Sequence, residues 1–158
     1  DFTVVAEPLM LRAAVSAQAS RPTREQVVIE LRPRLVGHAF PTGDLYRRLI
    51  VRVASEDGAW SEQRSLARHF APRRVAGQVI LSERSDDRVG VGAGSRIVEF
   101  EVPAELRERA LVWSLTYERV LKGGGTQAQV WDRSTVLEGR LEPRSTSEQS
   151  ERASTTTE

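Results

Sequence analysis

Apolar and polar residues alternate along Leu111-Val112-Trp113-Ser114-Leu115-Thr116-Tyr117-Glu118. In a β-strand, a period of two residues places one set of side chains on one face and the other set on the opposite face. The run Lys122-Gly123-Gly124-Gly125 then supplies a turn, because glycine readily adopts the positive φ angles of hairpin loops. Residues 126–137 return as a partner strand, so this part of the sequence predicts a β-hairpin.

The same alternation occurs in three earlier segments of the chain. The apolar members, which we expect on the core side, are Val27, Ile29 and Leu31; Leu49, Val51 and Val53; and Val98, Phe100 and Val102. The apolar runs 2–6 and 9–15 predict one or two opening strands. Shorter runs predict further strands at residues 66–70 and 79–81, and one that begins at Trp60. Turn residues separate the strands at 20–23, 55–58 and 85–94, and Pro103 opens a helical turn over 103–107.

Short strands with regularly spaced turns, and no long helix, predict an all-β fold. We expect an antiparallel, immunoglobulin-like β-sandwich of about seven to nine strands, formed by residues 1–142. Residues 143–158 are a polar tail rich in serine and threonine. Such a tail lacks the apolar side chains that would let it fold alone. It is therefore expected to be disordered unless a partner in a larger assembly orders it.

The composition of the 158-residue chain narrows the possible functions. The net charge is +1, Lys122 is the only lysine, and acidic residues are interleaved with the arginines, which argues against nucleic-acid binding. No run reaches the roughly 18–20 apolar residues that span a bilayer, so we expect no membrane span. The chain has no cysteine, which excludes disulfides, cysteine-ligated metals and covalent haem attachment through Cys-x-x-Cys-His.

The segment Gly37-His38-Ala39-Phe40-Pro41-Thr42-Gly43-Asp44 interrupts the strand pattern with a dense set of turn residues. Pro41 fixes one φ angle and Gly43 relieves strain, which favours a compact turn with a Phe40-Pro41 bond of either isomer. Asp44 is suited to accept backbone hydrogen bonds and hold that turn. His38 is then either directed outward as a ligand or hydrogen-bonded across the loop, and local chemistry alone favours the structural role.

Other candidate sites have weaker sequence support. A metal site built from this chain alone would have only two histidines to combine with carboxylates: His38 and His69, with Asp44, Asp86 and Asp87. Residues 90–95 are glycine-rich but precede a strand rather than a helix, which argues against a dinucleotide site. The aromatic residues could line a sugar-binding face or lie in the core: Trp60, Trp113, Trp131, Tyr46 and Tyr117. Trp113 and Tyr117 share one alternation set, which favours the core. We predict no enzymatic activity.

The segment 37–44, followed by Arg47-Arg48-Leu49, resembles a motif of β-sandwich domains in multihaem c-type cytochromes. The resemblance extends over roughly residues 25–120. It includes four further segments, which are Val27 to Leu31, Glu56-Asp57-Gly58, Asp87-Arg88 with its glycine-rich turn, and Leu115 to Arg119. The chain departs from that family because it has no haem-attachment motif, so any haem must be held by another segment or chain.

The resemblance implies a non-catalytic accessory domain or subunit of a multihaem electron-transfer assembly in the periplasm or outside the cell. This chain binds no cofactor covalently, and His38 is the expected axial ligand to a haem c that a neighbouring segment or chain holds. The residues expected to support the loop are Gly37, Phe40, Pro41, Thr42, Gly43 and Asp44. Candidate contacts with the cytochrome partner are Arg47, Arg48, His69, Arg73 and Arg74. The alternative function is that of an immunoglobulin-like adhesion or carbohydrate-binding module without haem.

Overall fold

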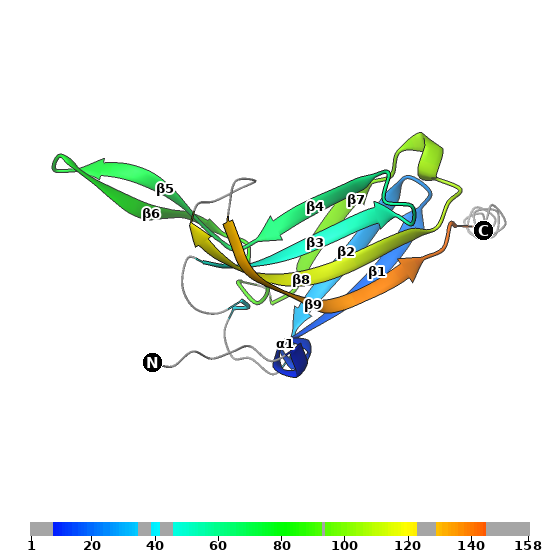
Figure 1. Cartoon of the computed structure of the whole chain (residues 1–158), viewed down its shortest axis with the longest axis horizontal. Coiled ribbons are helices and arrows are strands. Elements are labelled where there is room, and N and C mark those ends of the chain that lie inside the picture. Colours follow the sequence, from blue (N-terminus) through cyan, green and yellow to red (C-terminus); the bar gives the residue numbers. More distant parts are fainter. Residues whose placement is uncertain (1–7, 35–38, 42–45, 93, 123–128, 145–158) are drawn as a thin grey trace, which may run out of the picture.

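Figure 1 shows an elongated β-sandwich with one hairpin that extends beyond it. The computed structural model describes residues 8–34, 39–41, 46–92, 94–122 and 129–144. The elements of the sandwich are α1 (Pro8–Ala14), β1 (Val15–Thr23), β2 (Gln26–Pro33), β3 (Arg47–Ser55), β4 (Ser61–Leu66), β7 (Arg96–Glu101), the 3-10 helix η1 (Ala104–Leu106), β8 (Leu111–Lys122) and β9 (Gln129–Leu141). The hairpin, called here the arm, consists of β5 (Arg68–Val75) and β6 (Gln78–Asp86).

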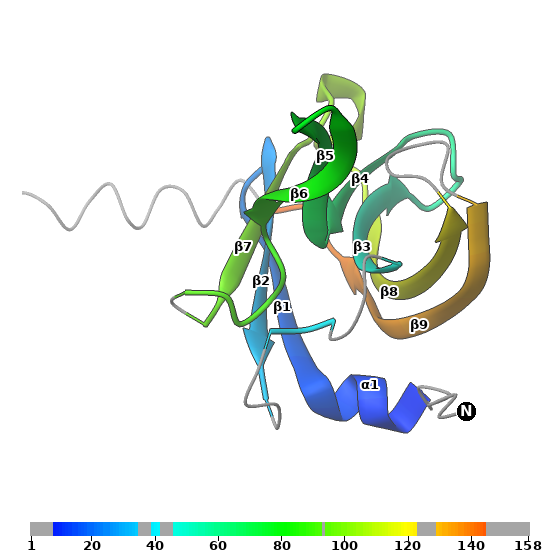
Figure 2. The same ribbon diagram turned by 90° about the vertical axis from the view of Figure 1, so that its left-hand side faces the viewer.

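Two antiparallel sheets form the sandwich. One sheet has the strand order β1-β2-β7 and the other β4-β3-β8-β9, and Figure 2 shows them face to face. In immunoglobulin domains strands A, B, E and D form one sheet and C, F and G form the other, which C′ joins in variable-type domains. The strands β1, β2 and β7 correspond to A, B and E, and β4, β3, β8 and β9 correspond to C′, C, F and G. The predicted all-β sandwich is therefore confirmed. The arm lies in the chain between the equivalents of C′ and E.

The core between the sheets contains the alternating residues that the sequence predicts. The fully buried members of β2, β3 and β8 are Val27, Ile29, Leu31, Leu49, Val51, Val53, Leu111 and Leu115. Strand register explains their contact, because Ile29 lies opposite Val98 and Val51 lies opposite Leu115. Each such side chain stabilises the fold by about 1.5–3 kcal/mol through burial, so these three strands form the centre of the sandwich.

The predicted turn at residues 55–58 is confirmed, and its side chains explain it. Gly58 has a φ of +72°, and its N–H donates to the carbonyl oxygen of Ser55 at 3.0 Å. The carboxylate of Asp57 accepts hydrogen bonds from the Ser55 hydroxyl at 2.6 Å and from the Ala59 N–H at 3.0 Å. The Ser55 hydroxyl, followed by the guanidinium of Arg109, holds the pKa of Asp57 well below its usual value.

The strand predicted at residues 9–15 is wrong, because most of this run forms α1 and β1 begins only at Val15. Leu11 and Ala14 are buried, and their spacing of three residues places them on one face of α1. Val15, which begins β1, is buried as well. Arg12 then donates from Nε to the carbonyl oxygen of Val136 at 3.1 Å, which ties α1 to β9. Within the described ranges, no helix is both long enough and apolar enough to cross a membrane.

The strand boundaries predicted around the arm are also wrong. The predicted strand over 66–70 is divided, since β4 ends at Leu66 and β5 begins at Arg68. The predicted connection at 85–94 starts too early, because β6 continues to Asp86. A change of partner strand causes both errors: β4 pairs with β3, whereas β5 pairs with β6 in a separate two-stranded sheet. The periodicity of apolar residues does not indicate where a strand changes its pairing partner.

Candidate functional site

β2 ends and β3 begins at one end of the sandwich, and the motif of residues 37–44 lies between these two strands in sequence. Register places the end of β2 beside the start of β7, and the start of β3 beside the ends of β4 and β8. The arm therefore leaves the sandwich at the end where β2 and β8 end and β3 and β9 begin (Figure 1). In immunoglobulin variable domains the equivalent end carries the binding loops.

Phe40 attaches this connection to the chain segment between β6 and β7. Its N–H donates to the carbonyl oxygen of Val89 at 2.7 Å, and the Val89 N–H donates to the carbonyl oxygen of Phe40 at 3.0 Å. The ring of Phe40 is buried and stacks on Tyr117 with 6.2 Å between centroids. The Phe40-Pro41 bond is cis, one of the two isomers that the sequence allowed.

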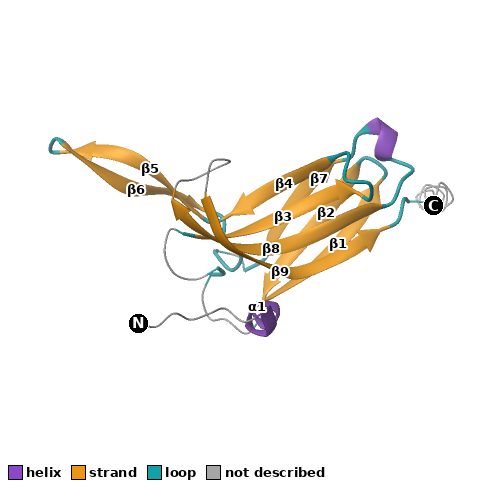
Figure 3. Ribbon diagram, in the orientation of Figure 1, coloured by secondary structure: helices purple, strands orange, loops and turns teal. Residues whose placement is uncertain are grey.

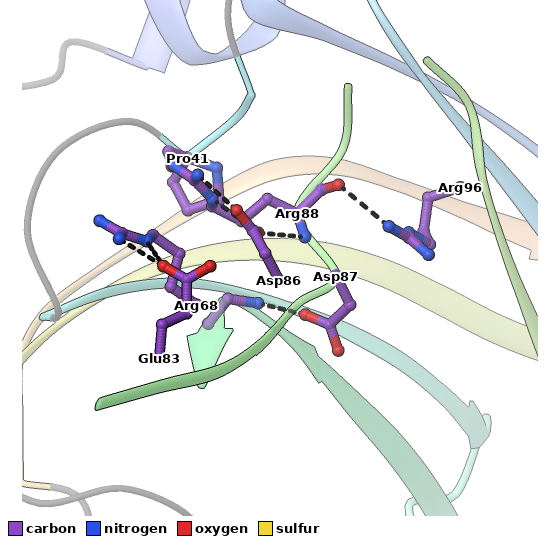
Figure 4. Close-up of polar contacts among 8 residues, drawn as sticks. Pro41, Arg68, Glu83, Asp86, Asp87, Arg88 and Arg96 are labelled. Atoms are coloured by element: carbon purple, nitrogen blue, oxygen red, sulfur yellow. Dashed lines mark hydrogen bonds and ion pairs between the residues drawn. The ribbon is translucent and has the colours of Figure 1, made fainter. Parts of the chain in front are cut away.

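Arg88 holds the residue that follows. Its Nη1 donates to the carbonyl oxygen of Pro41 at 3.2 Å. The same guanidinium makes a two-point ion pair with Asp86, at 2.9 Å from Nε and 2.6 Å from Nη2 (Figure 4). This hydrogen bonding from Arg88 lowers the pKa of Asp86. Phe40, Pro41, Asp86, Arg88 and Val89 are called here the loop anchor.

Asp87 connects the loop anchor to the base of the arm. Its carboxylate accepts a hydrogen bond from the Ala67 N–H at 2.7 Å and lies 2.9 Å from Nε2 of His69. The backbone N–H of Asp87 also donates to the carbonyl oxygen of Ala67 at 3.2 Å. Arg68 forms an ion pair with Glu83 across the arm's base. Residues 86–89 thus fix both the loop connection and the arm to the sandwich.

The structure brings together only part of the predicted site. Phe40 and Pro41 lie in the loop anchor, whereas the other predicted loop residues are outside the described residues: Gly37, His38, Thr42, Gly43 and Asp44. The five candidate partner contacts fall in three places. Arg47 and Arg48 begin β3, His69 lies at the base of the arm, and Arg73 and Arg74 lie near its tip.

Arg48 has an internal partner that the sequence analysis missed. Its guanidinium binds Glu118 with two contacts of 2.8 Å, and Arg133 binds the other carboxylate oxygen of Glu118 at 2.7 Å. Glu118 is buried, with 4% of its side chain exposed, although the alternation assigned it to the outer face. Buried carboxylates need paired cations. The sequence contains the two cations that pair with Glu118, Arg48 and Arg133. Only the strand register shows that both of them lie beside Glu118.

The described carboxylates are mainly engaged by arginines. No group of three histidine, cysteine, aspartate or glutamate residues suited to a metal ion occurs among the described residues. No family model, curated protein or solved structure matches this chain. The loop anchor, together with the sequence motif that includes Phe40 and Pro41, is therefore the strongest basis for a functional proposal.

Proposed function

We propose that this chain is a non-catalytic accessory domain or subunit of a multihaem c-type cytochrome assembly in the periplasm or outside the cell. In this proposal His38 is an axial ligand to a haem that another segment or chain holds. Haem is proposed as the group that His38 binds because the 37–44 motif resembles that of β-sandwich domains in multihaem cytochromes. The loop anchor is the observation that supports a role in presenting a side chain.

The anchor supports this role because of its position in the sequence. Phe40 is held by two backbone hydrogen bonds to Val89 and by the stack on Tyr117. A residue two positions from a fixed one stays within about 7 Å of it, so the anchor limits the region that His38 can occupy. A histidine that is already confined to a small region loses less conformational entropy when its imidazole binds iron. Groups that orient a metal-bound histidine also tune the metal.

A haem c peptide with an open sixth coordination position provides the test. Mixed with the wild-type chain, the ferric peptide is expected to shift its Soret band and adopt a low-spin spectrum as imidazole binds the iron. His38→Ala is expected to abolish the shift. His69→Ala is the matched control, because it removes the other histidine and should leave the shift intact. A low-spin spectrum that persists with His38→Ala would contradict the ligand role.

The anchor itself can be tested with the same peptide. Phe40→Leu keeps an apolar side chain but removes the stacked ring. If the anchor positions the loop, this variant retains the low-spin end point and binds the haem peptide more weakly. Unchanged affinity in a folded Phe40→Leu variant would show that the anchor does not position His38.

A hollow on the four-stranded sheet favours carbohydrate binding as a second candidate function. Its volume is about 460 Å³, and Trp113 lies in its wall. Arg52, Ser114 and Glu138 form a row across β3, β8 and β9 along the same hollow. Apolar rings beside polar groups are typical of small-molecule sites. Titration with neutral and acidic oligosaccharides, read by tryptophan fluorescence, tests this function. Binding that is unchanged by Glu138→Gln and Arg52→Gln would argue against the hollow.

A further inference from the structure

The arm carries a set of exposed large apolar side chains, and Figure 3 shows that the arm extends away from the sandwich. They are concentrated at its tip, and they are Val75, Val79, Ile80 and Leu81. Val79 and Leu81 are the most exposed, at 63% and 61%. An isolated two-stranded hairpin is only marginally stable in water. Among the elements that the structure describes, no other strand or helix packs extensively on the arm, so a third strand or a packed surface would stabilise it.

The two edges of the arm differ in their hydrogen-bonding capacity. Ala76 and Gly77 form a two-residue loop with φ angles of +49° and +81°, and Val75 pairs with Gln78 to close it. In such a hairpin the closing pair exchanges hydrogen bonds, and the next pair directs its N–H and C=O groups outward. Hydrogen-bonded pairs and outward-facing pairs then alternate along the hairpin. The backbone N–H and C=O groups of Val79 and Leu81 therefore point to the edge of β6 that does not pair with β5.

Pro72 shows why β6 is the better edge. It lies opposite Leu81, where the backbone of β5 also faces outward. Proline has no N–H, so the outer edge of β5 lacks a donor at this position. Residues 78–82 of β6 contain neither proline nor a charged residue. Charges and prolines are the usual protection of an exposed edge, so β6 is the unprotected edge of the arm.

The charges of the arm indicate the chemistry of its partner. Arg73, Arg74 and Arg84 form no ion pair with any residue that the structure describes. Residues 72–82 contain no acidic side chain. By contrast, Arg68 at the base is paired with Glu83. A partner that carries carboxylates beside its apolar side chains would complement this surface.

We propose that an extended, acidic segment of another protein adds to β6 as a third strand and pairs with Val79 and Leu81. Main-chain hydrogen bonds provide the contact, and the arginines select carboxylates. A second copy of the arm is disfavoured because the two tips would bring like charges together. An anionic bilayer is disfavoured because its hydrocarbon leaves the outward N–H and C=O groups unpaired. The inference is independent of the role proposed for His38.

The test uses the full chain and a fluorescent peptide of alternating glutamate and valine, blocked at both ends. We expect saturable binding that weakens with salt, and protection of the Val79 and Leu81 amides from hydrogen exchange. Leu81→Pro removes one outward donor, as Pro72 already does on β5, and should weaken binding about tenfold. Leu81→Thr keeps that donor and should weaken binding less. Arg73→Gln combined with Arg74→Gln should weaken binding and reduce its salt dependence.

Several outcomes would overturn the proposal. Equal binding by wild type and Leu81→Pro would contradict strand addition, and equal binding of a peptide with arginine in place of glutamate would contradict the preference for carboxylates. Preferential binding to anionic vesicles, or self-association that Leu81→Pro abolishes, would identify a different partner. Circular dichroism checks that each variant folds. If Leu81→Pro unfolds the arm, hydrogen exchange of the wild type with and without peptide tests the proposal instead. Absence of peptide-induced protection at the Val79 and Leu81 amides would contradict it. His38→Ala should leave peptide binding unchanged, so this test and the haem test fail separately.

Discussion

Arg88 donates a hydrogen bond from Nη1 to the carbonyl oxygen of Pro41 at 3.2 Å, across 47 positions of sequence. The same guanidinium is paired with Asp86 at the end of β6. One side chain therefore attaches the β2–β3 connection to the base of the arm. Both ends of the ion pair are mostly buried, with 16% of each side chain exposed.

Replacing Arg88 should destabilise the fold. Arg88→Gln removes the hydrogen bond to Pro41 and leaves Asp86 without its cation, at an expected cost of about 1–3 kcal/mol in the free energy of unfolding. Urea denaturation measures this change. Arg32→Gln is the control, because the Arg32–Glu30 pair is more exposed and its loss should change the free energy of unfolding much less. Equal costs for the two variants would contradict the role of Arg88.

The contribution of Asp86 should depend on pH. Arg88 lowers the pKa of Asp86 in the folded chain, so the unfolded chain binds its proton more readily and stability rises with pH. The contribution is complete above the unfolded pKa of about 4 and is lost as the pH falls through the lower folded pKa. We therefore expect the stability difference between wild type and Arg88→Gln to shrink below about pH 4. Urea titrations across this range would show a constant difference if Asp86 were not involved.

The two arginines that bind Glu118 should contribute unequally. Arg48 has 15% of its side chain exposed and Arg133 has 64%. Glu118→Gln removes the buried negative charge that both arginines bind, with an expected loss of about 3 kcal/mol or more in the free energy of unfolding. Arg133→Gln should cost about 1 kcal/mol or less, because water replaces the exposed cation. Chemical denaturation of both variants tests this order, and a larger loss for Arg133→Gln would reverse it.

Gly139 is required by the ring of Trp113. A Cβ atom at position 139 would lie 2.6 Å from Nε1 of Trp113 and 3.1 Å from Cε2. Gly139→Ala is therefore expected to displace the indole, with a cost of about 1–3 kcal/mol and a changed tryptophan emission. In a Trp113→Leu background the same substitution should be nearly neutral. A cost that remains in that background would show that the clash is not its cause.

The candidate site was only partly predictable from sequence. Its turn residues identified the 37–44 loop, and Phe40 and Pro41 do lie in the loop anchor. Arg88 was noted only as part of the resemblance, because nothing near it in sequence indicates a contact with Pro41. Glu118 occupies an outer position by alternation yet is buried between Arg48 and Arg133. Such contacts depend on which strands become neighbours. The ligand role of His38 stays a prediction.

The sequence by itself determined the strands whose alternation faces the core, the turn at 55–58 and the all-β class. These features are local, since the pleat repeats every two residues and a turn needs only its own side chains. The tertiary structure decided that residues 8–14 form a helix, that β5 and β6 leave the sandwich as an arm, and that Arg88 reaches Pro41. Each depends on surfaces and partners distant in sequence. Local sequence patterns do not depend on where those distant partners lie. These contacts are therefore determined only when the whole chain folds.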